Sequence, residues 1–249
     1  MDLGLSGRTA LVTGATGGIG REVARAFVAE GATVALGYRN DREGAERLAR
    51  ELKDAFAVRY ALDDADSAAE AVAAVRERRG GTDVFVANAF SWGRRRAPGT
   101  RFEDVAPDEW GPVVGHNLAP VVRATQLVLP QMRERGWGRI AFVSSHNAFD
   151  GQRGQEFYGT VKAGLYGLAR SLAWDVGQDG VLVNVVAPGL TLTERVRTGL
   201  PEEIRERERS RTPTGRLSTP QEVARTLLFL CSAANGNVTG ENVTVAGGR

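Results

Sequence analysis

Two patterns of hydrophobic and polar positions alternate along the chain. Short runs of Val, Ala, Leu and Phe predict strands, and longer segments with apolar residues three or four positions apart predict helices. Several runs, such as 181–186, are apolar throughout, which is typical of a strand buried on both faces. Strands alternating with helices predict an α/β domain with a doubly wound, mostly parallel sheet and helices on both faces. The predicted strands are 8–13, 32–37, 56–60, 82–87, 139–143, 181–186 and 242–245, and the predicted helices are 18–29, 41–54, 66–78, 107–133, 157–177 and 219–232.

The helix predicted over 157–177 is apolar on nearly every side, including Leu165, Leu168, Leu172 and Trp174. A surface helix of a monomer should carry a polar face. Deep burial within the subunit is one explanation, and a subunit interface is the other. We favour the interface, because exposed apolar surface usually marks a contact, and therefore expect a homo-oligomer.

Composition narrows the class of protein. The 249 residues are 42% hydrophobic, enough for a full core, and contain no linker, repeat or low-complexity stretch, so we predict one domain over 1–249. A net charge of only +2 is not the large positive charge that is typical of proteins that bind nucleic acids or membrane surfaces. No signal sequence and no apolar run long enough to span a bilayer is present. We expect a cytoplasmic protein with no nucleic-acid partner, no membrane partner and no metal.

A tyrosine and a lysine mark the candidate chemistry. In Tyr158-Gly-Thr-Val-Lys162 the two side chains are four positions apart, on one face of the predicted helix. A nearby cation favours the phenolate, so we expect Lys162 to lower the pKa of Tyr158 and make it a usable general acid. Taken alone, such a pair is most often a surface accident.

A glycine-rich turn supports the chemical interpretation. Residues 14–20 hold Gly14, Gly17, Gly18 and Gly20, directly after an apolar strand and before a helix. Glycines let the backbone approach phosphates closely, and the helix N-terminus attracts the anion. A flexible loop is the alternative, but the flanking strand and helix argue against it. The turn predicts a dinucleotide site.

The spacing Gly14-x3-Gly18-x-Gly20, together with Ser145, Asn117 and the Tyr158–Lys162 pair, resembles the short-chain dehydrogenase/reductase family. The resemblance runs from Leu5 to Gly248. It implies a single Rossmann-like domain with a seven-stranded sheet, and a dimer or homotetramer. The runs 162–165 and 184–189 look closest to 3-oxoacyl carrier-protein reductases and polyketide ketoreductases.

The resemblance also implies catalytic roles for Asn117, Ser145, Tyr158 and Lys162. Tyr158 would protonate a ketone oxygen while a hydride reaches the carbon, and Ser145 would hydrogen-bond that oxygen. Lys162 would bind the nicotinamide ribose, and Asn117 would hold a water linking Lys162 to solvent. From the residues alone, the alternative for Asn117 is a capping or kink residue beside Pro120.

Cofactor choice depends on the end of the second strand. Sites that prefer NAD place a carboxylate there, and this chain has Tyr38 followed by Arg39, whose guanidinium suits a 2′-phosphate. We predict NADP(H), with a solvated loop charge as the alternative for Arg39. The resemblance also implies that Asp63 contacts the edge of the adenine and that the loop over residues 188–193 lies beside the nicotinamide. The predicted cofactor residues are Gly14, Thr16, Gly18, Ile19, Gly20, Tyr38, Arg39, Asp63, Asn88, Ala89, Tyr158, Lys162, Pro188, Gly189, Thr191 and Thr193.

The substrate region departs from the family pattern. Phe90 stands where the family usually has glycine after Asn88-Ala89, and Trp92 follows, so an aromatic wall suited to flat ketones is expected. Segment 190–214 reads as a mobile lid helix. The predicted substrate residues are Phe90, Trp92, Ser145, Tyr158 and Leu190. The cations Arg94, Arg95, Arg96 and Arg101 suggest a dock for an anionic substrate or an acyl carrier protein, or merely a solvated loop.

The sequence therefore predicts an NADPH-dependent ketoreductase acting on a polyketide-type, aromatic or 3-oxoacyl ketone. A secondary-alcohol dehydrogenase working in the oxidative direction is one alternative, and a non-enzymatic NADP(H)-binding sensor or scaffold is another. A sensor has no need of Ser145, Tyr158, Lys162 and Asn117 together. A lyase or dehalogenase on this fold would be expected to lose the glycine turn, which is intact.

Overall fold

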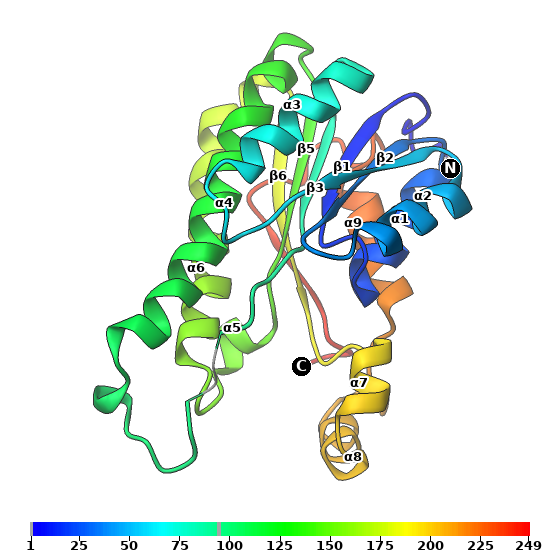
Figure 1. Cartoon of the computed structure of the whole chain (residues 1–249). Coiled ribbons are helices and arrows are strands. Elements are labelled where there is room, and N and C mark those ends of the chain that lie inside the picture. Colours follow the sequence, from blue (N-terminus) through cyan, green and yellow to red (C-terminus); the bar gives the residue numbers. More distant parts are fainter. Residues whose placement is uncertain (1, 94–95) are drawn as a thin grey trace.

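The computed structural model describes residues 2–93 and 96–249 as one layered α/β domain around a parallel sheet (Figure 1). The seven strands lie in the order β3-β2-β1-β4-β5-β6-β7. The order reverses direction between β1 and β4, where ligands bind in doubly wound sheets. The strands are β1 (Thr9–Thr13), β2 (Thr33–Tyr38), β3 (Ala55–Arg59), β4 (Val84–Ala87), β5 (Gly138–Val143), β6 (Val181–Pro188) and β7 (Asn242–Val245).

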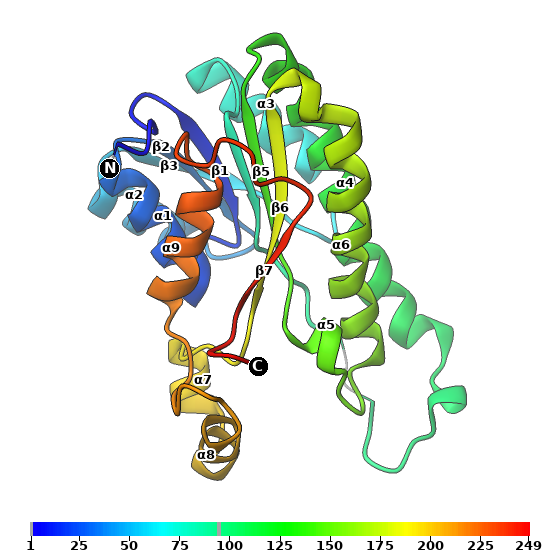
Figure 2. The same cartoon turned by 180° about the vertical axis from the view of Figure 1, so that it is seen from behind.

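Helices cover both faces of the sheet, as the two opposite views show (Figures 1 and 2). One face is covered by α1 (Gly18–Ala29), α2 (Arg42–Leu52) and α9 (Pro220–Leu230), and the other by α3 (Ser67–Arg79), α4 (Pro107–Glu134) and α6 (Glu156–Val176). The short helices lie beyond the carboxyl ends of the strands. They are α5 (Asn147–Asp150), α7 (Glu194–Gly199) and α8 (Glu202–Ser210), together with the single turn η1 (Phe102–Asp104). A second single turn, η2 (Gly177–Asp179), lies at the opposite edge of the sheet and leads from α6 into β6.

Each face of the sheet has its own hydrophobic core. Leu11 and Phe85 pack with α3, α4 and α6, whereas the neighbouring Val12 and Val86 pack with α1 and α9. All four side chains are fully buried. Successive side chains of a strand point to opposite faces, so a strand between two helical layers must be apolar at every position.

The N-termini of the helices differ in whether a side chain caps them, and this difference bears on anion binding. Asp41 caps α2 by accepting a hydrogen bond from the Gly44 N–H at 2.9 Å. Thr219 and Glu222 form a capping box at α9. By contrast, α1 begins at Gly18 with no side-chain cap and no acidic residue in its first turn. Its first N–H groups are therefore suited to an anion.

The seven predicted strands and six predicted helices are confirmed, with ends shifted by a few residues. The single lid helix predicted within 190–214 is wrong, because the segment forms two helices, α7 and α8. Between them Leu200 is extended, with φ −101° and ψ 128°, and Pro201 follows. Proline lacks an N–H and disfavours a helical conformation at the preceding residue, so one helix cannot run through.

The outer face of α6 is exposed, as an interface helix would require. Trp174 is 86% exposed and Ala163 is also exposed, while Leu165 and Ala169 face the core. The oligomeric state itself stays a prediction. Among residues 2–93 and 96–249, none of the helices combines the length and apolar character needed to cross a bilayer.

Candidate active site

The glycine turn connects β1 to α1 in a backbone path that requires glycine at particular positions. Gly14 has a φ of +63°. A Cβ at Gly20 would lie 2.3 Å from the carbonyl oxygen of Gly14, which cannot move aside because it is backbone. At Gly18 a Cβ would meet the Thr193 Cγ2 at 2.6 Å. The turn therefore lies directly against Thr193, the residue that caps α7.

The end of β4 is fastened to this turn. The buried Thr13 hydroxyl accepts hydrogen bonds from the N–H groups of Asn88 and Ala89, both at 3.0 Å. The Asn88 amide donates to the carbonyl oxygens of Thr13 at 3.0 Å and Gly14 at 3.2 Å. Thr13 was missed by the sequence analysis, although a hydroxyl that ends an apolar strand before a glycine turn is a usable signal.

These features fit a dinucleotide. Gly17 and Gly18 are exposed, Thr16 and Ile19 are half-buried beside them, and α1 begins uncapped. Such a turn would hold the pyrophosphate of NAD(P). From the other side, Pro188 ends β6 and Gly189 follows, with the Thr191 hydroxyl donating to the Gly189 carbonyl at 3.0 Å.

The predicted adenosine residues form an ion pair. Arg39 follows β2 and pairs with Asp63, which follows β3. The hydrogen bond from Arg39 holds the pKa of Asp63 below its usual value. Tyr38 ends β2 beside them, half-buried. We expected Arg39 and Asp63 to make separate contacts with the cofactor, and in the structure the two side chains pair with each other.

Tyr158 and Lys162 lie one turn apart on α6, as the spacing predicts. The Lys162 Nζ donates a hydrogen bond to the carbonyl oxygen of Val143, at the end of β5, over 2.8 Å. Lys162 is buried, and this burial lowers its pKa to about 7. Lys162 can therefore gain or lose a proton near neutral pH.

The pKa of Tyr158 is raised from its ordinary value, so the predicted lowering by Lys162 is wrong. Burial is the larger cause, and a hydrogen bond with the Ser145 hydroxyl acts in the opposite direction. The Lys162 Nζ is 5.9 Å from the centre of the Tyr158 ring, and its own charge is disfavoured by burial. Tyr158 is thus held as the neutral phenol, which can donate a proton.

Asn117 anchors the loop that follows Asn88. Its Oδ1 accepts a hydrogen bond from the Ser91 N–H at 2.7 Å, and its Nδ2 donates to the carbonyls of Ser91 at 2.9 Å and Val113 at 2.8 Å. Within the described chain these side-chain contacts go to backbone and not to Lys162. The role of Asn117 in a water-mediated proton path stays a prediction.

Two aromatic rings, those of Trp92 and Phe90, pack against the ring of Tyr158. Trp92 stacks on Tyr158 with ring centres 5.1 Å apart and planes 7° from parallel. Phe90 meets both rings edge-on, at 4.9 Å from Trp92 and 5.0 Å from Tyr158. The Lys162 Nζ lies 4.7 Å from the Phe90 ring centre. Phe90 and Trp92 therefore adjoin the candidate catalytic group, and their packing accounts for the burial of Tyr158.

The charged loop is only partly described. Arg94 and Arg95 lie outside the described residues. Arg96 pairs with Glu156 at 2.8 Å, so it is not a free cation, and Arg101 lies near Glu103 at 3.9 Å. Besides Lys162, a second cation among the described residues reaches the aromatic group: Arg195 of α7 lies 5.6 Å from the Trp92 ring centre. No sequence signal separates Arg195 from its charged neighbours.

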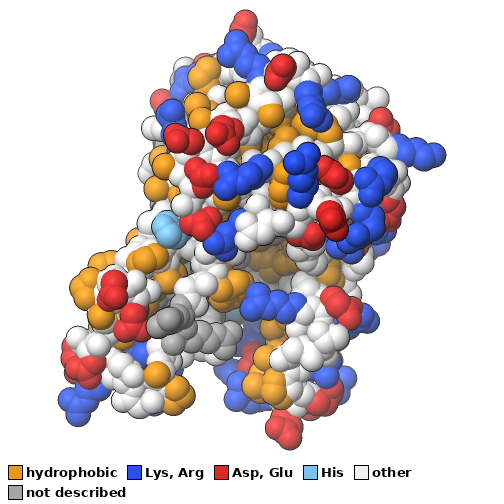
Figure 3. All heavy atoms as spheres, in the orientation of Figure 1, with side chains coloured by type: hydrophobic (Ala, Val, Ile, Leu, Met, Phe, Trp, Pro, Cys, Tyr) orange, Lys and Arg blue, Asp and Glu red, His pale blue; other side chains and the backbone are white. Residues whose placement is uncertain are grey.

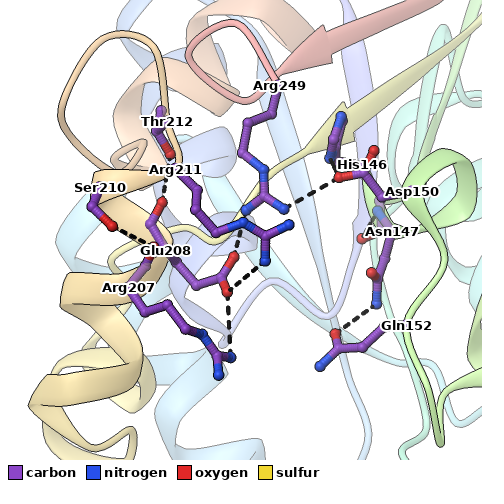
Figure 4. A network of polar contacts seen from close by, with 11 residues as sticks. His146, Asn147, Asp150, Gln152, Arg207, Glu208, Ser210, Arg211, Thr212 and Arg249 are labelled. Atoms are coloured by element: carbon purple, nitrogen blue, oxygen red, sulfur yellow. Dashed lines mark hydrogen bonds and ion pairs between the residues drawn. The ribbon is translucent and has the colours of Figure 1, made fainter.

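Beyond the strand ends, the molecule is hollowed between a lobe that carries α7 and α8 and a lobe formed by the ends of α4 and α6 (Figure 3). A polar network through Arg249 joins α8 to α5 (Figure 4). Arg249 pairs with Glu208 of α8 and, at 3.2 Å, with Asp150 of α5. Asp150 also lies 3.2 Å from the Nδ1 of His146, the residue after Ser145. Leu190 begins the segment that leads from β6 to α7, half-buried.

Known proteins agree with this arrangement. A family model described as Enoyl-(Acyl carrier protein) reductase matches residues 14–249. Acetoacetyl-CoA reductase of Rhizobium meliloti (strain 1021) is 36% identical over 97% of this chain and 98% of that protein. The 3-oxoacyl-[acyl-carrier-protein] reductase FabG of Aquifex aeolicus (strain VF5) is 36% identical over 100% of this chain and 99% of that one.

A solved structure resembles the fold closely. A 7α-hydroxysteroid dehydrogenase, complexed with NADH and 7-oxo glycochenodeoxycholic acid, is 30% identical with a TM-score of 0.90, covering 99% of this chain and 96% of that chain. Sequence and structure therefore agree from the glycine turn to the last strand, and the chain belongs to the short-chain dehydrogenase/reductase family of oxidoreductases.

Proposed function

We propose that the chain is an NADPH-dependent ketoreductase with Tyr158 as its general acid. The observation that carries the proposal is the meeting of Tyr158, Ser145 and Lys162 at the carboxyl end of β5, at the same edge of the sheet as the glycine turn. The similar acetoacetyl-CoA reductase and 3-oxoacyl-[acyl-carrier-protein] reductase support the reduction of a ketone, because both are named for 3-oxo substrates.

The residues of this chain then act as follows. When bound, the nicotinamide supplies the hydride. Tyr158 donates its phenolic proton to the ketone oxygen, and its raised pKa keeps that proton in place until charge develops. The Ser145 hydroxyl hydrogen-bonds the same oxygen and stabilises its charge. Lys162, with a pKa of about 7, returns a proton toward Tyr158 near neutral pH.

The choice of NADPH rests on Tyr38 and Arg39. Tyr38 stands where a carboxylate would hold the ribose 2′-hydroxyl of NADH, and a carboxylate there would repel a 2′-phosphate. Arg39 is 52% exposed, so its guanidinium can turn from Asp63 toward a phosphate. The similar dehydrogenase structure was solved with NADH, so cofactor preference varies among the relatives.

A ring-bearing ketone is the substrate that we favour. Phe90 and Trp92 form an aromatic wall beside Tyr158, and such walls suit flat apolar ligands. The polycyclic ketone in the similar dehydrogenase structure supports this class. A 3-oxoacyl thioester, free or held by an acyl carrier protein, is the second candidate, favoured by the names of the relatives. A homodimer or homotetramer through the outer face of α6 completes the proposal.

NADPH consumption by the purified protein tests this function. The panel contains a polycyclic ketone, acetoacetyl-CoA, a short aliphatic ketone and, as a control for carbon–carbon double-bond reduction, a 2-enoyl thioester. Tyr158→Phe is the matched negative control. We expect consumption with at least one ketone and none with the enoyl thioester. NADPH binding with no turnover of any ketone or alcohol would favour a sensor, and turnover of a secondary alcohol with NADP⁺ alone would favour the oxidative enzyme.

A further inference from the structure

The indole of Trp92 covers one face of the Tyr158 ring, yet Trp92 remains 50% exposed. Its backbone is fixed on both sides. Ser91 is held through its N–H and its carbonyl by Asn117. A Cβ at Gly93 would lie 2.1 Å from the Val113 Cγ2, so Gly93 packs directly against α4. Because both neighbours of Trp92 contact α4, rotation of the Trp92 side chain is the movement that would uncover Tyr158 with the least change in the backbone.

The second contact with the indole comes from the opposite lobe. Arg195 in α7 lies over the Trp92 ring at 5.6 Å from its centre, a cation–π arrangement. Helix α7 begins after Thr193, which caps it by accepting from the Val196 N–H at 3.3 Å and touches the position of Gly18. The helix that carries Arg195 thus contacts both the glycine turn and the ring that covers Tyr158.

We propose that Trp92 is a gate over Tyr158 and that Arg195 holds this gate closed from α7. The inference rests on the proposed function, because it assumes that a ketone must reach Tyr158. In the closed position the indole lies on the phenol ring of Tyr158 and is also in contact with Arg195. A substrate enters when the indole rotates away, and α7 controls how often it does so.

The gate also explains how the site would select substrates. A planar ring system can take the place of the indole against Tyr158 and Phe90. Its own stacking on Tyr158 then compensates for the lost contact between Trp92 and Tyr158. A short aliphatic ketone cannot, and it reacts only with the fraction of molecules whose gate is open. Contacts of the stacking and cation–π kind shift such an equilibrium by about two- to tenfold each.

Fluorescence quenching tests the gate without any substrate. In a variant that carries Trp110→Phe, Trp137→Phe and Trp174→Phe, Trp92 is the sole tryptophan. We expect Arg195→Leu in this background to raise the acrylamide quenching constant of Trp92 by about twofold, and Arg195→Lys to leave it within error of the parent. Equal quenching in all three proteins would overturn the gate. If the sole-tryptophan protein fails a circular-dichroism melt, the difference between each native-sequence protein and its Trp92→Phe partner supplies the same constant.

Kinetics supply the second arm. Arg195→Leu should raise kcat/KM for a short aliphatic ketone by about two- to fivefold, with Arg195→Lys as the control and the KM for NADPH unchanged in both. Changed quenching with no ketone turnover by any protein would support the gate and contradict the proposed function. Ketone turnover with unchanged quenching would support the proposed function and overturn the gate.

Discussion

The Arg39 guanidinium is joined to the Asp63 carboxylate across the carboxyl ends of β2 and β3. The Arg39 side chain is 52% exposed and that of Asp63 is 35% exposed, and an ion pair at such a surface contributes little to stability. A 2′-phosphate can therefore compete with Asp63 for Arg39. If NADPH is the cofactor, as proposed, this ion pair joins the cation that would bind its 2′-phosphate to an anion that would repel that phosphate.

Cofactor preference should follow changes in this pair. Asp63→Asn removes the competing anion and keeps a hydrogen-bonding side chain, so the KM for NADPH should fall by a few fold. The double substitution Tyr38→Asp and Arg39→Ala should shift preference toward NADH, because the new carboxylate accepts the 2′-hydroxyl and repels the phosphate. The ratio of kcat/KM for the two cofactors measures both effects. An unchanged ratio in both proteins would show that the phosphate is held elsewhere.

Burial of Lys162 should appear in the pH dependence of stability. The lysine pKa is about 7 in the folded chain, against 10.5 for an ordinary lysine. Between these values the unfolded chain binds more protons than the folded one, so the stability of the wild type rises with pH across this window. Below about pH 7, Lys162 is protonated in the folded chain as well, and the full cost of burying its charge then lowers the free energy of unfolding.

Lys162→Met removes that penalty and keeps the length of the side chain. The variant should gain most relative to wild type at about pH 6, and its gain should shrink as pH rises toward about pH 10. Urea unfolding of both proteins at matched pH values gives the difference. A difference that stays constant across this window would mean that Lys162 remains protonated in the folded chain.

Local patterns predict much of this protein, and tertiary packing decides the rest. Strand and helix positions follow from periodicity, and the neighbourhood of Tyr158 and Lys162 follows from helical spacing. The direction of the Tyr158 pKa shift does not, because it depends on how Phe90 and Trp92 bury the phenol. Charge spacing alone misleads where desolvation is the larger effect.

Contacts between side chains far apart in the sequence could not be predicted from local patterns either. Asn117 was a candidate for its unfavourable place within a helix, but its partner Ser91 lies 26 residues away. Arg195 meets Trp92 only because α7 folds back over the strand ends. The break between α7 and α8 could have been read from Pro201, which disfavours a helical conformation at the residue before it.

Removal of one oxygen tests whether Tyr158 is the general acid, as proposed. Tyr158→Phe keeps the ring that packs between Phe90 and Trp92 and loses only the proton donor. Turnover should fall by about 10²–10⁴-fold, while the Kd for NADPH should stay nearly unchanged. Single-turnover kinetics and cofactor fluorescence measure the two quantities. Retention of more than about a tenth of the wild-type rate would assign the proton transfer to another group.

Phe90 should affect one class of substrate more than another. Phe90→Gly restores the residue usual in the family and removes a ring that touches Trp92, Tyr158 and Lys162. An aromatic contact is worth about 0.5–1.5 kcal/mol beyond burial, so the KM for ring-bearing ketones should rise by a few fold to about tenfold. The KM for short aliphatic ketones should barely change. Equal losses on all ketones with a lower Tm would show that Phe90 only fills the core.

Arg249 should control how firmly α8 is held against the rest of the domain. Its guanidinium joins Glu208 to Asp150, and the Arg249 and Glu208 side chains are only 20% and 17% exposed. Burial alone would raise the pKa of Glu208, yet the hydrogen bond from Arg249 and the neighbouring arginines lower it, so the carboxylate stays charged in this contact. Breaking such a partly buried pair leaves Glu208 without its main partner.

Limited trypsin digestion reports the result, because α8 and its C-terminus carry Arg205, Arg207, Arg209 and Arg211 as cleavage sites. Arg249→Met should speed cleavage there by roughly fivefold, the effect of about 1 kcal/mol on local opening. Arg197→Met, which removes a pair confined to α7, is the control and should leave the rate in α8 unchanged. Glu208→Gln should match Arg249→Met, and the double variant should add little beyond either, because the two changes remove the same contact. Additive effects would mean that Arg249 and Glu208 stabilise α8 through separate partners, with Asp150 as the principal partner of Arg249.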